Sequence, residues 1–175
     1  ADTYDFNNLS VLPRSSDKFL VWGEILKNYA INCGIPAEKI EIVGSPTYDD
    51  FFLKTKNSDF NDSFILLATT NPINNLIFDL TVASRLQREQ AIKKICQTVT
   101  KLNKKMIIKL HTNPAEIDIT NFVHQINPEI TVVKAGNILD LMKNCTVFIT
   151  LNSSTTLLES QICMKPSISI SVSDR

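Results

Sequence analysis

Residues 146–171 read TVFITLNSSTTLLESQICMKPSISIS, and this stretch decides the fold class. A strand-length run that is apolar almost throughout (146–151) is followed by a helix-length segment opening on small hydroxylated residues (153–163), and then by a second short strand (167–171). Strands with so few polar residues are typical of a parallel sheet that helices cover on both faces. The stretch therefore predicts a strand, helix, strand unit with parallel strands.

The same alternation extends over the rest of the chain. We expect further strands at 18–22, 39–43, 63–69, 106–110 and 130–134. We expect helices at 24–33, 82–103, 115–126 and 137–144, in addition to the one at 153–163. With right-handed crossovers, residues 63–175 form a Rossmann-like, doubly wound parallel sheet. The predicted fold class is α/β.

A turn-rich segment divides the chain. The stretch 44–50, GSPTYDD, and the polar stretch 54–62 are predicted to be a linker. We expect a remnant of a preceding N-terminal domain with its linker at 1–52, and the Rossmann-like domain at 53–175. Because the chain begins at Ala and stops just after an apolar strand, we also expect it to be an excised part of a longer chain.

Composition excludes several classes of protein. Of the 175 residues 43% are hydrophobic, and Lys+Arg 18 balance Asp+Glu 18, which is typical of a soluble globular protein. A net charge of zero argues against nucleic acid as a partner. We interpret the basic group, Lys93, Lys94, Lys101, Lys104, Lys105 and Lys109, as the solvated face of a helix leading into a strand.

The four cysteines form no CxxC pair and have apolar neighbours, so we interpret them as small core residues of a reduced, cytoplasmic protein. No apolar run reaches the roughly 20 residues that cross a bilayer, and the N-terminal residues lack the pattern of a signal peptide. The expected localisation is cytoplasmic.

In an open parallel sheet, ligands bind beyond the carboxyl ends of the strands. Polar residues occupy those positions here: Thr69 and Thr70, His111, Lys134, and the run 152–156. The run opens a helix, whose first N–H groups and dipole favour an anion, so Ser153, Ser154 and Thr155 are a candidate phosphate site. Glu159, one turn along, is placed to accept bonds from ribose or sugar hydroxyls.

A purely structural interpretation of this turn stays open. Serine and threonine are ordinary helix caps, and Thr156 with Glu159 matches a capping box. His111 is equally compatible with binding phosphate, with acid–base chemistry and with structural hydrogen bonding. Arg85 and Arg88 either reach a ligand or solvate a helix. The sequence contains no metal-ligand spacing, glycine-rich phosphate loop or GxSxG nucleophile elbow, so we predict no metal and no cofactor.

Four segments, in order, resemble the C-terminal nucleotide-binding half of GT-B glycosyltransferases, the group of bacterial polysialyltransferases, capsule polysaccharide transferases and CDP-glycerol glycerophosphotransferases. They are VWGEILKNYAINCGIPAEKIEIVGSPTYDDF (21–51), FILLATTNP (64–72), MIIKLHTNP (106–114) and VFITLNSSTTLLESQICMKPSISI (147–170). The similarity spans nearly the whole chain. It implies a donor-binding domain of an enzyme that makes a surface polysaccharide or glycoconjugate.

The resemblance also implies roles for residues. His111, Ser153, Ser154 and Thr155 would hold the donor's phosphates and Glu159 its ribose, and Thr69 and Thr70 complete the expected site. The substrate would be a CMP-, CDP- or UDP-linked sugar, and the acceptor a glycan or lipid-linked glycan. The catalytic base would come from the missing N-terminal half, so this chain alone would be inactive. Peripheral membrane association through the missing part is compatible with the resemblance.

His-x-Asn-Pro at 111–114 departs from the strict His-Pro of these transferases and resembles hydrolysing UDP-N-acetylglucosamine 2-epimerases, which share the fold. Epimerases, however, carry an HRREN-like run after the first strand and Ser-Gly-Gly-x-x-x-Glu at the phosphate turn. This chain has Thr69-Thr70-Asn71 and Ser153-Ser154-Thr155 instead. We therefore place the transferase first and the epimerase as the alternative.

A non-catalytic interaction module is the further alternative, since fold alone does not fix function. An open crevice above Thr70, His111 and 153–155 would favour a binding site. In a purely structural module, the chain's own loop 70–82 would fill that crevice.

Overall fold

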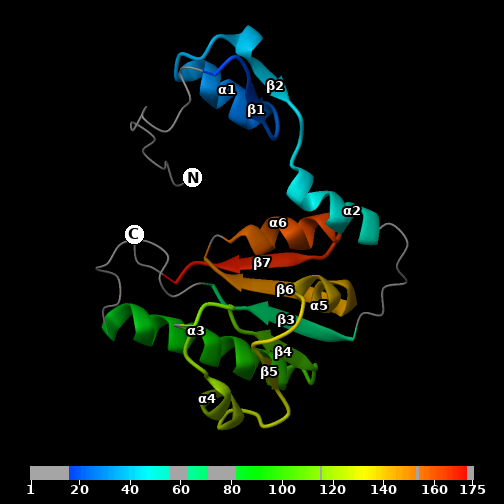
Figure 1. The fold of residues 1–175 in the computed structure, drawn as a ribbon. Helices are drawn as coiled ribbons and strands as arrows, with labels where there is room; N and C mark the ends of the chain where they lie inside the picture. Colours follow the sequence, from blue (N-terminus) through cyan, green and yellow to red (C-terminus); the bar gives the residue numbers. More distant parts are fainter. Residues whose placement is uncertain (1–15, 56–62, 71–81, 115, 153, 173–175) are drawn as a thin grey trace. The chain divides into compact units, whose positions relative to one another are not determined.

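The computed structural model describes residues 16–55, 63–70, 82–114, 116–152 and 154–172 (Figure 1). The chain divides into two compact units, Ala1–Asp50 and Phe51–Arg175. The division lies near the predicted boundary between residues 52 and 53. That the first unit is the remnant of a larger domain stays a prediction.

The first unit holds a small parallel sheet. Strands β1 (Phe19–Val21) and β2 (Ile40–Ile42) pair in register, and α1 (Glu24–Asn32) connects them. Because Gly34 has a φ of +89, the chain reverses directly after α1. The N–H of Ile35 then donates to the carbonyl of Ala30 at 3.0 Å, and Ala30 packs against Val21. Short 3₁₀ turns follow at Ala37–Lys39 and Pro46–Tyr48.

The second unit is a five-stranded sheet in which every pairing is parallel, in the order β5-β4-β3-β6-β7. Its strands are β3 (Phe64–Ala68), β4 (Met106–Lys109), β5 (Thr131–Val133), β6 (Cys145–Leu151) and β7 (Ser167–Ile170). Each lies where an apolar run predicted it. The predicted α/β, Rossmann-like class is confirmed.

Helices cover both faces of this sheet. They are α2 (Asp49–Thr55), α3 (Val82–Lys101), α4 (Thr120–His124), α5 (Ile138–Asn144) and α6 (Thr155–Ile162). In Figure 1, α3 and α4 lie on one face and α5 and α6 on the other. One helix follows each of β3, β4, β5 and β6, as expected for crossovers between parallel strands.

Two separate cores result, because neighbouring strand residues point to opposite faces. Leu67 of β3 joins the α3 residues Ile92 and Val99 in the first core. Leu66, the residue before it, joins Phe148 of β6 and faces the α5 side. Both leucines are fully buried. The sheet is therefore apolar on both sides, and polar chemistry is left to its edges.

The cysteines are all free thiols, and Cys96, Cys145 and Cys163 lie buried in these cores, as the sequence predicted. Burial raises the pKa of the Cys96 thiol to about 11 and also raises the pKa of Cys163. Cys33, in the first unit, is half-buried.

Two predicted segments differ from the structure. The helix expected at 115–126 is shorter, with α4 at Thr120–His124 and Ile119 as its N-cap, and the Asp118 carboxylate accepts the N–H of Thr120 at 2.8 Å just before it. The linker expected at 44–62 contains α2, because Phe51 is apolar and packs against the second core. Residues 56–62 of that linker lie outside the described residues.

Candidate functional site

The predicted site lies at the carboxyl edge of the second sheet. Parallel register places the last residue of β3, Ala68, beside Lys109 of β4 and Thr150 of β6. The segments that follow these three strands therefore leave the sheet at the same edge. They carry the predicted residues Thr69, Thr70, His111 and 153–155.

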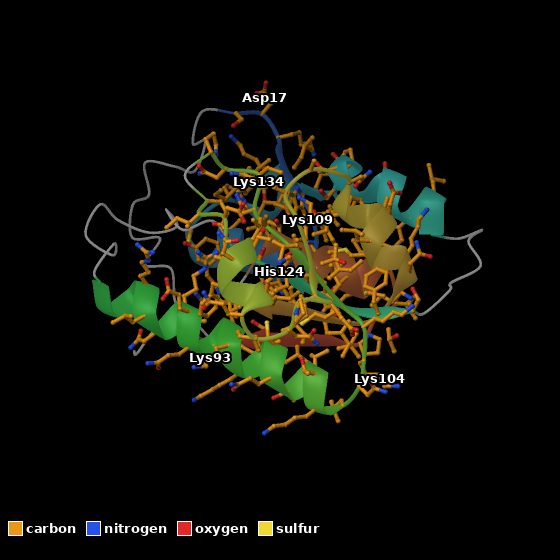
Figure 2. The ribbon with its side chains drawn as sticks, turned by 90° about the horizontal axis from the view of Figure 1, so that it is seen from below. Asp17, Lys93, Lys104, Lys109, His124 and Lys134 are labelled. Carbon is orange, nitrogen blue, oxygen red and sulfur yellow. The ribbon has the colours of Figure 1, made fainter. Side chains whose placement is uncertain are left out.

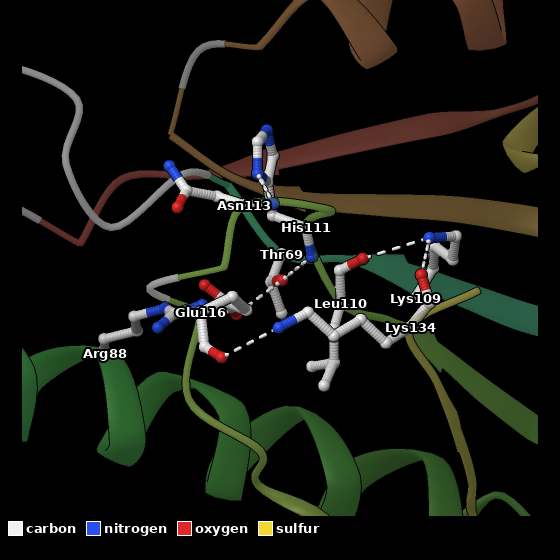
Figure 3. Close-up of polar contacts among 8 residues, drawn as sticks. All are labelled: Thr69, Arg88, Lys109, Leu110, His111, Asn113, Glu116 and Lys134. Atoms are coloured by element: carbon white, nitrogen blue, oxygen red, sulfur yellow. Dashed lines mark hydrogen bonds and ion pairs between the residues drawn. The ribbon is translucent and has the colours of Figure 1, made fainter.

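His111 is held in a defined orientation (Figure 3). Its main-chain N–H donates to Oγ1 of Thr69 at 2.9 Å, and its ring Nδ1 accepts the N–H of Asn113 at 3.0 Å. Because Nδ1 is an acceptor, the neutral ring carries its proton on Nε2. The His-x-Asn-Pro spacing is compatible with this bond, because residue 113 is an asparagine whose main-chain N–H donates to the ring.

A buried polar cluster supports this turn, and the sequence did not reveal it. The side chain of Glu116 is fully buried and accepts from the Thr69 hydroxyl at 2.8 Å and from the guanidinium of Arg88. Its other oxygen, Oε2, has no partner among the described residues. Arg88 thus binds a buried carboxylate rather than solvating α3, whereas Arg85 pairs at the surface with Glu89 at 3.1 Å.

The interpretation of the basic group as a solvated face is wrong for Lys109, which is buried. Its ammonium is buried and donates to the carbonyls of Leu110 at 3.1 Å and Lys134 at 2.7 Å. Burial lowers the pKa of Lys109. The other members of the group are exposed as predicted, and Figure 2 shows Lys93 and Lys104 extending away from α3. Lys109 fastens the end of β4 to the end of β5.

Helix α6 begins at the end of β6. Ser154 is its N-cap, and its hydroxyl accepts the N–H of Thr156 at 3.4 Å. Thr155 is exposed in the first turn, and Ser153 lies outside the described residues. The capping box expected from Thr156 and Glu159 is wrong, because the cap is Ser154 and Glu159 lies too far along the helix to reach it.

One carboxylate oxygen of Glu159, Oε2, has no hydrogen-bond partner among the residues that the structure describes. The residue is half-buried, and this oxygen is enclosed. Burial raises the pKa of this carboxyl above its ordinary value of 4.5. A buried acceptor without a donor costs stability, so the position suggests a ligand hydroxyl as its missing partner.

This burial predicts a pH-dependent stability difference. The folded chain keeps the Glu159 proton to higher pH than the unfolded chain does, so wild type loses stability relative to Glu159→Gln as pH rises past 4.5 through the raised pKa. We expect the variant's advantage in unfolding free energy to be larger at about pH 8 than at about pH 4. Urea denaturation of both proteins at both pH values measures it. An equal difference at both would contradict the burial of this charge.

The surface hollows of the described chain are not lined by the residues predicted for this site. Two surface hollows lie elsewhere, one between α3 and α4 beside Phe122 and one between α3 and β7 beside Ile170. Within the described ranges, no three His, Cys, Asp or Glu side chains cluster as metal ligands, and no helix could span a membrane. Most of the loop 70–82, on which the test of an open crevice depends, lies outside the described residues.

Comparison with solved structures places the fold. The UDP-GlcNAc 2-epimerase from Methanocaldococcus jannaschii aligns over 88% of this chain and 46% of its own, with TM-score 0.58 and 20% identity. The enzyme from Neisseria meningitidis, bound to UDP-GlcNAc, aligns over 93% of this chain and 48% of its own, with TM-score 0.59 and 16% identity. The chain thus spans about half the length of these enzymes and shares their GT-B-like fold.

Comparison of sequences points the same way. No curated protein matches the chain. The family model for UDP-N-acetylglucosamine 2-epimerase matches residues 9–175. This finding supports the epimerase, which we had placed as the alternative, over the glycosyltransferase, which no comparison confirms. By this match over nearly its whole length, the chain belongs to the UDP-N-acetylglucosamine 2-epimerase family.

Proposed function

We propose that this chain is the nucleotide-sugar-binding half of an enzyme that epimerises a UDP-linked N-acetylated amino sugar at carbon 2. The observation that carries the proposal is the enclosed Oε2 of Glu159, which has no partner among the described residues and lies on α6, the helix that begins at the sheet edge where α/β folds bind ligands. The family match and the UDP-GlcNAc bound to the related Neisseria enzyme support UDP over CMP or CDP as the nucleotide.

Five of the predicted residues have proposed binding tasks. The first N–H groups of α6 and the hydroxyls of Ser153 and Thr155 bind the diphosphate, whose negative charge the helix dipole favours. Nε2–H of His111 donates to a phosphate oxygen. Glu159 accepts from the ribose hydroxyls, which satisfies its free oxygen. Thr70 is half-buried at the same edge and borders the sugar.

The groups that move protons on the sugar are proposed to lie outside this chain, which spans about half the length of the related enzymes. Epimerisation at carbon 2 requires proton removal and return next to the anomeric centre. Of the residues assembled at this edge, His111 and Glu159 already have binding tasks. The chain alone should therefore bind the nucleotide without turnover.

A glycosyltransferase remains the second candidate, and specific residues favour it. The chain has Thr69-Thr70-Asn71 where epimerases carry a basic run, and no glycine pair at 153–155. A transferase of the resembled group would use CMP- or CDP-linked donors. The nucleotide that binds therefore separates the two candidates.

Calorimetric titration of the chain with UDP, UDP-GlcNAc, CMP and CDP tests the proposal. We expect binding of the two uridine ligands, and we expect Glu159→Gln to weaken UDP binding by about tenfold or more, since bonds to a charged acceptor contribute roughly 1.5–3 kcal/mol. The matched control is Glu129→Gln, which removes the same charge from an exposed loop before β5 and should leave affinity unchanged.

The other outcomes are equally informative. Binding of CMP or CDP alone would favour the transferase. Equal weakening by both glutamate variants would remove Glu159 from the site. Binding of no nucleotide would contradict the proposed function for this chain and favour the interaction module.

A further inference from the structure

The segment that follows β4, described at residues 111–114 and 116, is held by a chain of hydrogen bonds that begins at Thr69 (Figure 3). Four of these bonds join Thr69, His111, Asn113 and Glu116 into a closed set. We infer that Thr69 and Glu116 are positioning residues, which hold His111 so that Nε2–H faces the bound anion. The presence of an anion at this place rests on the proposed function, whereas the hydrogen bonds that hold His111 do not depend on it.

The Thr69 hydroxyl has no donor left for an anionic ligand in this arrangement. Its hydroxyl donates its one hydrogen to Oε1 of Glu116 at 2.8 Å and accepts the main-chain N–H of His111 at 2.9 Å. The residue is only 5% exposed. Thr69 therefore acts on the site through His111, rather than by the direct contact expected from its position after a strand.

Glu116 fixes the far end of the turn. Its main-chain N–H donates to the carbonyl of Asn113 at 3.0 Å, and its own carbonyl accepts from Nζ of Lys134 at 3.3 Å. Its carboxylate binds Arg88 of α3 as well as Thr69. One residue thus fastens the turn to the end of β3, to α3 and to the segment after β5.

The closed turn sets the chemistry of the imidazole. Nδ1 of His111 can accept from Asn113 only while residues 111–113 keep this conformation. That bond leaves Nε2–H as the ring's donor. If the bond from the Thr69 hydroxyl is lost, the N–H of His111 loses its partner and Oε1 of Glu116 loses one of its two, so His111 is held less firmly. The ring then exchanges between its two tautomers.

The test compares Thr69→Val, which has nearly the same shape without the hydroxyl, with Thr69→Ser, which keeps it. The first readout is the tautomer of His111 in the full chain without ligand, observed by ¹⁵N NMR of the histidine rings. The chain has only two histidines, and the spectrum of His111→Ala assigns the second, His124. We expect Nε2–H in wild type and Thr69→Ser, and a mixture of tautomers in Thr69→Val. An unchanged tautomer in Thr69→Val would overturn the inference.

The second readout is UDP affinity in a double-mutant cycle. We expect Thr69→Val to weaken binding by about fivefold in wild type and by less than about twofold in the His111→Ala background, because Thr69 acts through His111. Equal losses in both backgrounds would contradict a positioning role and indicate direct contact or general damage. If UDP does not bind wild type, the proposed function fails, whereas the tautomer measurement still decides whether Thr69 positions His111.

Discussion

Replacing Arg88 with methionine is expected to lower the free energy of unfolding by about 3–5 kcal/mol, because breaking a buried ion pair leaves an unpaired buried charge. Glu116 would be left fully buried with only the Thr69 hydroxyl on its carboxylate. Methionine keeps most of the arginine's apolar stem, so the change reports on the charge. Urea denaturation followed by far-UV circular dichroism measures it. The single tryptophan, Trp22, lies in the first unit and is unsuitable for following this one.

The chain contains its own control for this experiment. Arg85 lies on the same helix and also pairs with a glutamate, but its side chain is 63% exposed. Arg85→Met should change stability by less than about 0.5 kcal/mol, as is typical of solvated pairs four residues apart on a helix. If Arg88→Met and Arg85→Met lowered the free energy of unfolding equally, the buried Arg88–Glu116 pair would be no more important for stability than the exposed pair.

Replacing Leu66 with alanine is expected to cost about 2–5 kcal/mol of unfolding free energy, since it removes buried methyl groups and leaves a cavity. Leu66 lies on β3, the central strand, and is fully buried against the core that includes Phe148 and Met142. The same denaturation measurement applies.

Leu102→Ala is the matched control. Leu102 is 60% exposed just after α3, so the same truncation removes little buried surface and should cost less than about 0.5 kcal/mol. A loss at Leu66 no greater than that at Leu102 would contradict the two-core description of the sheet.

The strands could be predicted because burial on both faces of a sheet favours continuous apolar runs in the sequence. Most residues of a doubly covered strand are apolar, so runs such as FILLA at 64–68 are visible without a structure. Short helices have a weaker sequence pattern. Helix α2 escaped prediction because Pro46 and the aspartates 49 and 50 are also typical of a linker, and the burial of Phe51 depends on a core formed by distant residues.

The candidate site was predictable in part for the same reason. His111, Ser154 and Glu159 follow strand ends, and position in an α/β sheet selects them. Glu116 and Arg88 follow no such rule. They are 28 residues apart, and their pairing depends on how α3 packs beside the turn after β4. Charged residues are usually exposed, so a buried arginine–glutamate pair contradicts the most probable interpretation of each residue taken alone.

The residues that distinguish the two candidate families are different from the residues that decide the fold. Apolar strands and the turn after β6 are common to both families and favour neither. The His-x-Asn-Pro spacing supported the epimerase, and in the structure the N–H of Asn113 bonds to the ring of His111 at 3.0 Å. A departure from one family's pattern was therefore informative about the other.

The burial of three of the four thiols makes the chain a convenient object for chemical labelling. Cys96, Cys145 and Cys163 are enclosed, and Cys33 is the thiol that solvent reaches. A maleimide dye or spin label would therefore attach at one place, in the first unit, without any engineered substitution. A second label, introduced at the exposed Lys104 position after exchange to cysteine, would make the separation of the two units measurable in solution, with and without nucleotide.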